Sequence, residues 1–211
     1  MEISRNLDFK ILGNINDAKL CLIFIHGWKG NKNSFERVAK SFDVKSSVWV
    51  LPQAPYLLNG EKDGYSWTYE ISPGKYQRDE PVQMLLDFFE TKIFSKFNSK
   101  DVYLFGFSQG GLVCYEMIRI LDKSLGGVFP IGGFMAGTKK EMRRIHPAQT
   151  NTPIIIGHGD SDEVILKKES EFAYRLLSKE SDYVDIDIYK GGHKIGLGYI
   201  KKVKEFIEKR Y

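Results

Sequence analysis

The sequence predicts a three-layer α/β domain, with a mostly parallel central sheet and helices on both of its faces. Apolar runs rich in β-branched and aromatic residues alternate along the chain with segments of helical periodicity. Most of these runs are apolar throughout, as expected of strands that are covered on both faces. A length of 211 residues suits one domain, so we expect a single domain over residues 1–211.

Six apolar runs are predicted to be strands of this sheet. The last run alternates apolar with polar residues, so it is expected at an edge of the sheet with one face in water. The first ten or so residues are expected to add an antiparallel edge strand, and the pattern leaves the spatial order of the strands open. The six runs are 20–25, 48–51, 102–105, 127–131, 154–156 and 184–189.

Five segments between these runs are predicted to be helices, because their apolar residues recur at helical spacing. The segment 56–79 does not fit the alternation, since it is long, polar and aromatic. Loops of that length in a compact domain are usually functional, which makes this one a candidate lid. The predicted helices are 33–42, 81–97, 109–121, 167–177 and 199–207.

The composition excludes several classes of protein. The chain is 42% hydrophobic and 27% charged, which excludes a disordered or low-complexity protein. The net charge of +4 comes from scattered basic residues, so no nucleic-acid partner is indicated. Cys21 and Cys114 lie in apolar stretches and are expected to be buried free thiols. With no secretion-signal pattern and no apolar run long enough to span a membrane, a cytoplasmic protein is expected.

The clearest chemical motif is Gly-x-Ser-x-Gly at 106–110, which follows a predicted strand and precedes a predicted helix. In this context the motif is typical of a nucleophile elbow, a sharp turn that exposes a serine hydroxyl in a strained backbone conformation. The glycines leave room for the neighbouring strand and helix. The alternative is a glycine-rich helix start with Ser108 as its capping residue. The strand, the helix and a third glycine, Gly111, favour Ser108 as a nucleophile.

A serine nucleophile needs a base, and the chain has four histidines. In folds with this elbow the acid and then the histidine follow the serine along the chain, which excludes His26. His193 follows the last predicted strand, and Gly191 and Gly192 let its loop bring the imidazole over the strand ends. The alternative for His193 is an exposed loop histidine. His146 precedes a proline and is expected to end a helix or cap a loop.

The acid is expected between these two residues, in the turn after the strand at 154–156. Asp160 and Asp162 compete for the role, with Glu163 as a weaker third candidate. Asp162 is favoured because an acid two residues further along is better placed to reach the imidazole. Asp160 is expected to tie the turn through its own backbone. The alternative is that both aspartates only form the turn.

The loop at 26–30, after the first strong strand, is the candidate partner of Ser108 in an oxyanion hole. One N–H donor comes from the residue after the nucleophile, Gln109, and a second comes from this earlier loop. We expect Trp28 to donate through its backbone, the alternative being a surface turn with a core-facing indole. Trp67 and Tyr69, in the 56–79 segment, are the candidate substrate-binding residues and suggest an apolar acyl or aryl group.

Together these motifs resemble the phospholipase/carboxylesterase family of α/β-hydrolases, which includes acyl-protein thioesterases and small bacterial carboxylesterases. The resemblance implies an α/β-hydrolase fold, Ser108 as nucleophile, Asp162 as orienting acid and His193 as base. It also implies the Trp28 and Gln109 N–H groups as the oxyanion hole. It spans about residues 20–195 and rests on FIHG at 24–27, LPQAPY at 51–56, SW at 66–67, GFSQGG at 106–111, HGDSDEVI at 158–165 and GH at 192–193.

The sequence therefore predicts a serine esterase that acts through a covalent intermediate and requires no metal ion or organic cofactor. Its substrate would be a small-molecule ester, with thioesters left open. The aromatic, lysine-bearing 56–79 loop favours simple carboxylic esters over lipidated proteins. Trp-Lys-Gly, where many members of the family have Leu-Gly-Asp, leaves the polarity of the pocket near the oxyanion hole open. Alternative functions are a hydrolase-fold protein that binds a ligand with little turnover, and a peptidase. A homodimer would form through the final edge strand or an exposed aromatic patch.

Overall fold

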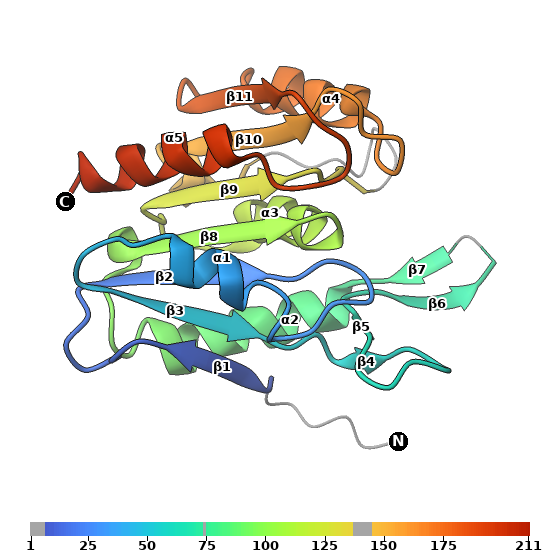
Figure 1. The fold of residues 1–211 in the computed structure, drawn as a ribbon, viewed down its shortest axis with the longest axis horizontal. Coiled ribbons are helices and arrows are strands. Elements are labelled where there is room, and N and C mark those ends of the chain that lie inside the picture. The colour runs from blue at the N-terminus through green and yellow to red at the C-terminus, as the bar shows by residue number, and fades with distance from the viewer. Residues whose placement is uncertain (1–6, 74, 137–144) are drawn as a thin grey trace.

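The computed structural model describes residues 7–73, 75–136 and 145–211. A seven-stranded sheet with helices on both faces runs through them (Figure 1), which confirms the predicted architecture. The strand order is β1-β3-β2-β8-β9-β10-β11, and every neighbouring pair is parallel except β1 with β3. These strands are β1 (Phe9–Leu12), β2 (Leu20–Ile25), β3 (Ser47–Pro52), β8 (Val102–Phe107), β9 (Gly127–Ile131), β10 (Ile154–Gly159) and β11 (Val184–Tyr189).

Both edge predictions are confirmed, since β1 is antiparallel at one edge and β11 lies at the other. The structure extends β8 and β10 beyond their apolar runs. Phe107 still pairs with Ile131, and Gly159 still pairs with Tyr189. The ladder thus continues into the residues that precede the predicted site, because backbone pairing does not require an apolar side chain.

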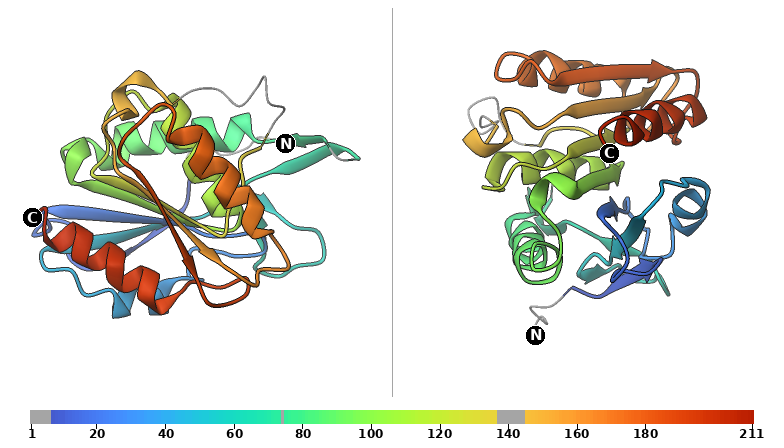
Figure 2. Two further views of the ribbon diagram at one scale, coloured as in Figure 1. Left: turned by 90° about the horizontal axis from the view of Figure 1, so that it is seen from above. Right: turned by 90° about the vertical axis from the view of Figure 1, so that its left-hand side faces the viewer.

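The helices divide between the two faces of the sheet, as Figure 2 shows. Helices α2, α3 and α4 pack on one face, over a core that includes Ile23, Leu104 and Ile156. Helices α1 and α5 cover the other face, over an aromatic core that includes Phe24 and Phe105. The helices are α1 (Glu36–Ser41), α2 (Asp79–Phe88), α3 (Gln109–Ile120), α4 (Lys167–Leu177) and α5 (Leu197–Glu208).

Two predicted helices are shorter in the structure, and in both cases polar side chains bond the backbone locally. Before α1, the backbone N–H of Asn33 donates to Asn31 Oδ1 and the N–H of Asn31 donates to Ser34 Oγ, so the chain turns instead of starting a helix. The predicted helix at 81–97 ends as α2 at Phe88 and continues as a π-helical turn, Phe89–Ile93. Within that turn the Thr91 hydroxyl donates to the carbonyl oxygen of Asp87.

The irregular segment 56–79 contains two small hairpins. The first pairs β4 (Tyr56–Leu57) with β5 (Tyr65–Ser66), and the second pairs β6 (Tyr69–Ser72) with β7 (Lys75–Gln77). The second hairpin projects from the end of the sheet at which the parallel strands finish (Figure 1). Side chains of β6 are exposed along its whole length.

Cys21 and Cys114 are buried free thiols, as predicted, and burial raises the pKa of Cys21 to about 12. His146 caps the short 3-10 helix Pro147–Gln149, where its Nδ1 accepts the N–H of Ala148 at 3.2 Å. Within the described residues, no helix combines the length and apolar character needed to cross a lipid bilayer.

Candidate active site

Ser108 stands in the turn between β8 and α3, and its backbone conformation is strained. Its φ of 56° and ψ of −117° lie in a region that L-residues rarely occupy. It takes the capping position of α3, yet its side chain makes no capping hydrogen bond. Helix capping therefore does not explain this serine, and its hydroxyl is available to other partners.

Two glycines make this turn sterically feasible. A Cβ on Gly106 would overlap the carbonyl oxygen of Gly110, and a Cβ on Gly110 would overlap that of Ile25. Helix α3 thus starts directly against β8 and β2, with Ser108 at its positive N-terminal end.

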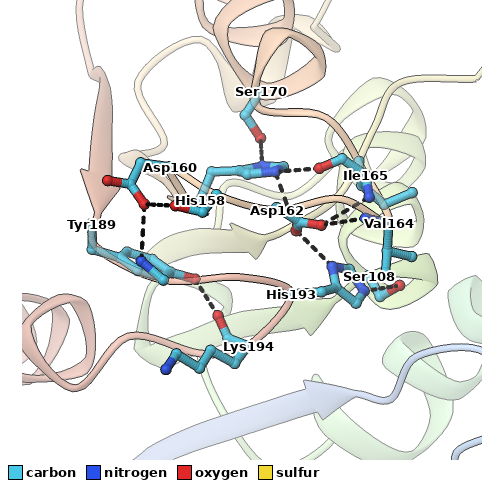
Figure 3. A network of polar contacts seen from close by, with 12 residues as sticks. Ser108, His158, Asp160, Asp162, Val164, Ile165, Ser170, Tyr189, His193 and Lys194 are labelled. Carbon is cyan, nitrogen blue, oxygen red and sulfur yellow. Dashed lines mark hydrogen bonds and ion pairs between the residues drawn. The ribbon is translucent and has the colours of Figure 1, made fainter.

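The imidazole of His193 links Ser108 to a buried carboxylate (Figure 3). Its Nε2 lies 2.9 Å from Ser108 Oγ, and its Nδ1 lies 2.6 Å from Asp162 Oδ2. The ring also packs on Phe107, with 4.8 Å between ring centroids. With Asp162 ionised, Nδ1 carries the proton and Nε2 is left free to accept the proton of the serine hydroxyl.

Asp162 is almost fully buried, with 1% of its side chain exposed. Its Oδ1 accepts the backbone N–H groups of Val164 and Ile165, both at 2.9 Å. Burial alone would raise the pKa of this carboxyl, but the hydrogen bonds from His193, Ile165 and Val164 together hold the pKa below its usual range. The carboxylate form is therefore favoured beside the imidazole.

Asp160 has a different partner from the one expected. Its Oδ1 accepts the N–H of Gly191 at 3.0 Å and the hydroxyl of Ser161 at 2.7 Å, so it fastens the histidine loop rather than its own turn. The turn closed by an aspartate on its own backbone belongs to Asp162 instead. Gly159 permits this arrangement, because a Cβ there would overlap the carbonyl oxygens of Gly191 and Gly192.

The loop after β2 approaches Ser108 closely. A Cβ on Gly27 would come within 3.2 Å of Ser108 Cβ, so only a glycine fits this approach without displacing a neighbour. The next residue, Trp28, is 59% exposed, which excludes a core-facing indole. Neither the Trp28 N–H nor the Gln109 N–H has a hydrogen-bond acceptor in the part of the chain that the structure describes. Two unpaired donors therefore lie beside Ser108, one on the loop after β2 and one on the first residue of α3.

His26 fixes the base of this loop. Its Nδ1 donates to the carbonyl oxygen of Gly27 at 2.8 Å, and its Nε2 accepts the N–H of Ala54 at 3.0 Å. Burial lowers the pKa of His26 to about 4, so the imidazole is neutral at neutral pH. His26 thus ties the loop to the segment that follows β3.

The comparisons with known proteins agree with this geometry. A family model described as Phospholipase/Carboxylesterase matches residues 7–211. The chain belongs to the phospholipase/carboxylesterase family. The predicted family is thereby confirmed, and so is the assignment to the carboxylesterase class of enzymes.

Individual members of the phospholipase/carboxylesterase family are distant in sequence. Carboxylesterase SOBER1 of Arabidopsis thaliana is 22% identical, over 92% of this chain and 91% of that protein. Acyl-protein thioesterase 1 of Debaryomyces hansenii is 26% identical, over 74% and 75% respectively. The solved structure of esterase PE8 is 21% identical and covers 97% of this chain and 99% of its own, with a TM-score of 0.82. This structural similarity confirms the predicted α/β-hydrolase fold.

Trp67 and Tyr69 lie in different environments, although the sequence suggested one role for both. Trp67 is buried, with 1% exposed, whereas Tyr69 is 57% exposed and lines a cavity of about 320 Å³ together with Trp28, Tyr56 and Tyr76. Trp67 is not among the residues that line this cavity. Aromatic and polar residues are mixed in the 56–79 segment, so the sequence pattern could not show that Trp67 is buried and Tyr69 exposed.

The sequence analysis missed a second histidine beside Asp162. The side chain of His158 is fully buried, and its Nε2 donates to the carbonyl oxygen of Ile165 at 2.8 Å. The same nitrogen lies 3.4 Å from Asp162 Oδ2, while Nδ1 contacts Ser170 Oγ at 2.7 Å (Figure 3). His158 thus braces the turn that carries the acid. Its position four residues before Asp162 was the available signal.

Within the described residues, no three His, Cys, Asp or Glu side chains are grouped so that they could hold a metal ion.

Proposed function

We propose that the protein hydrolyses carboxylic esters, thioesters included, of small or medium acyl groups through a triad of Ser108, His193 and Asp162. Membership of the phospholipase/carboxylesterase family supports ester hydrolysis in general. The observation that carries the mechanism is the continuous chain from Ser108 Oγ through the His193 ring to Asp162 Oδ2, with contacts of 2.9 and 2.6 Å.

In the proposed first step, Ser108 Oγ attacks the carbonyl carbon of the ester as His193 Nε2 takes the hydroxyl proton. Asp162 keeps the Nδ1–H tautomer in place and stabilises the imidazolium that forms. The tetrahedral intermediate then expels the alcohol, or the thiol of a thioester, which takes the proton from Nε2. An acyl group remains on Ser108.

Water completes the cycle in the second step. His193 accepts a proton from the attacking water, and the collapse of the second tetrahedral intermediate returns a proton to Ser108 and releases the carboxylic acid. In both steps the negatively charged oxygen of the tetrahedral intermediate would accept hydrogen bonds from the unpaired backbone N–H groups of Trp28 and Gln109. Removing one such donor typically slows an enzyme by a factor of about 10² to 10³.

The size of the acyl group is proposed from the cavity beside Trp28. Its volume of about 320 Å³ and its tyrosine-rich lining suit a small or medium apolar group. Tyr69 is the proposed substrate contact. We do not extend that role to Trp67, because its side chain is buried behind the loops.

Hydrolysis of p-nitrophenyl esters of increasing acyl length, by the wild type and by Ser108→Ala, tests this function. We expect turnover by the wild type and none above background by a folded Ser108→Ala variant. Wild-type activity in that variant would exclude Ser108 as the nucleophile. Release of one equivalent of nitrophenol without steady turnover would favour the ligand-binding alternative instead.

A further inference from the structure

The short segment 65–68 lies between the loop that carries Trp28 and the start of α3, where Gln109 follows Ser108. On one side it pairs with the loop that carries Trp28. The N–H of Lys29 donates to the carbonyl oxygen of Tyr65, and the N–H of Tyr65 donates to that of Gly30, both at 3.0 Å. The indole Nε1 of Trp67 donates to the carbonyl oxygen of His26, also at 3.0 Å. Three hydrogen bonds therefore fix this side.

On its other side the segment is held by the side chain of Gln109, the residue after the nucleophile. Gln109 Oε1 accepts the N–H of Trp67 at 2.8 Å. Gln109 Nε2 donates to Ser66 Oγ and to Thr68 Oγ1, both at 2.9 Å. Gln109 is only 8% exposed, so these hydrogen bonds are shielded from water. Losing such buried partners is costly, because the remaining groups cannot turn to solvent.

We propose that segment 65–68 and the Gln109 side chain form a clamp that sets the separation between the Trp28 and Gln109 N–H groups. This inference rests on the proposed function. Donors in an oxyanion hole act well only within about 2.7–3.1 Å of the charged oxygen. Here the two donors lie far apart in the chain, one on the loop after β2 and one at the start of α3, and the clamp bonds both segments directly. Gln109 thus has two roles, with its main chain donating to the oxyanion and its side chain positioning the partner donor.

The clamp explains why Trp67 is buried and hydrogen-bonded through both of its N–H groups, and not exposed in the cavity. Its ring lies 5.3 Å from the His26 ring, centroid to centroid, and its indole N–H and backbone N–H bond opposite sides of the clamp. Ser66 and Thr68 line the proposed acyl cavity, but Gln109 and Trp67 do not. Deleting hydrogen bonds of Gln109 or Trp67 should therefore slow the chemical step more than it weakens substrate binding.

Gln109→Met tests the clamp, since it keeps the main chain and the side-chain length but deletes three hydrogen bonds. We expect kcat for a p-nitrophenyl ester to fall about 10- to 100-fold, less than the loss of a whole donor, with KM within about 3-fold. Inhibition by a boronic acid, which forms a tetrahedral adduct with the serine, should weaken by a similar factor.

Gln149→Met is the matched control. Gln149 is fully buried and its amide also holds several partners, including the carbonyl oxygens of Leu121 and Lys123, but it contacts neither loop of the proposed oxyanion hole. This control should lose stability and keep kcat at temperatures where it is folded. An equal loss of kcat in both variants would overturn the clamp, and so would a rise in KM alone for Gln109→Met.

Trp67→Phe provides a second test, because it keeps most of the packing and deletes the bond to His26. Trp49→Phe is its control, since Trp49 is a buried indole whose Nε1 has no partner in the described structure. We expect kcat to fall at least about 5-fold for Trp67→Phe and to stay within about 2-fold for Trp49→Phe.

Amide hydrogen exchange separates failure of the clamp from failure of the proposed function. In Gln109→Met the amides of Lys29 and Tyr65 should exchange faster, whereas those of α5 should not change. Wild-type turnover that depends on Ser108, together with unchanged kcat and unchanged exchange in Gln109→Met, would overturn the clamp alone. Absence of any Ser108-dependent turnover in the wild type would overturn the proposed function, and with it the assignment of the clamp to an oxyanion hole.

Discussion

The groups on the two sides of Ser108 are held by different means. Asp162 and His193 stand on loops that directly follow β10 and β11, and main-chain N–H groups fix Asp162 from residues two and three positions away. Trp28 stands on a loop that is bonded to distant parts of the chain. The indole of Trp67 donates to the carbonyl oxygen of His26, and the imidazole of His26 accepts the N–H of Ala54. On the proposed proton-transfer side the acid is fixed by local main-chain bonds, whereas the loop of the proposed anion-binding side is fixed by long-range contacts.

The two sides also differ in the charge state of a buried ionisable group, Asp162 on one side and His26 on the other. Asp162 is stabilised as an anion by hydrogen bonds, whereas His26 is kept neutral by burial. The side that carries His193 depends on the negative charge of Asp162, whereas the loop that carries Trp28 depends on His26 being uncharged. Substitutions and changes in pH should therefore affect the two sides differently.

The largest expected effect is on the proton-transfer side. Asp162→Asn should lower kcat by a factor on the order of 10⁴ while the fold is kept. The amide oxygen can still accept from Val164 and Ile165, but an amide N–H facing Nδ1 would favour the tautomer whose Nε2 is already protonated. That imidazole cannot accept the proton of Ser108. Steady-state kinetics beside circular dichroism would measure both properties.

Asp160→Asn is the matched control for that substitution. Asp160 lies two residues away, and its carboxylate accepts from the Gly191 N–H and the Ser161 hydroxyl without contacting His193 in the described structure, so its loss should cost less than about 10-fold in kcat. A larger loss for Asp160→Asn than for Asp162→Asn would show that the orienting acid is misassigned.

The same contrast explains what the sequence was able to predict. Strands, the nucleophile turn and the order of Ser108, Asp162 and His193 follow from local patterns, because each residue lies just beyond an apolar run. The six central strands were located correctly for this reason. The roles of Gln109 Nε2 and of the Trp67 indole could not be found in this way, since their partners are more than 40 residues distant. Sequence spacing also did not distinguish the buried Trp67 from the exposed Tyr69.

The next prediction concerns Gly106 in β8, the strand that leads into the turn of Ser108. Gly106→Ala should destabilise the protein by more than about 3 kcal/mol, because the new Cβ would overlap the carbonyl oxygen of Gly110 and displace the start of α3. Gly198→Ala is the control: this glycine lies in α5 with open space around its Cα, so alanine should be neutral or stabilising by up to about 1 kcal/mol. Urea denaturation of both variants measures the difference, and equal stabilities would contradict the close packing of the turn.

The pH dependence of stability should separate the two buried groups. Burial lowers the pKa of His26 from 6.5 to about 4, so between these values the unfolded chain binds a proton that the folded chain does not. The free energy of unfolding should therefore fall as the pH is lowered through this window, by at most about 1.4 kcal/mol per pH unit. Asp162 has a folded pKa below its usual 3.8, so its contribution is lost only at lower pH.

His26→Gln isolates the first of these effects. The side-chain oxygen of glutamine can replace Nε2 as acceptor for the Ala54 N–H but does not titrate. Urea denaturation between pH 4.5 and 7 should show a flatter dependence for this variant than for the wild type. Curves that are parallel for the two proteins would mean that His26 takes up its proton in the folded state as readily as in the unfolded chain.

The smallest expected effect is on substrate preference, which we expect the cavity beside Trp28 to influence. Tyr69 lines the cavity beside Trp28 and packs against Tyr56, with 5.6 Å between ring centroids. Tyr69→Ala should change kcat/KM for medium-chain p-nitrophenyl esters by about 3- to 10-fold, the range expected for one aromatic contact, and leave acetate esters nearly unaffected. Tyr183→Ala, at a similarly exposed tyrosine that precedes β11, should change neither. A loss that is equal for all chain lengths in Tyr69→Ala would mean that this residue supports the loop rather than the acyl group. The cavity would then no longer be assigned as the binding site of the acyl chain.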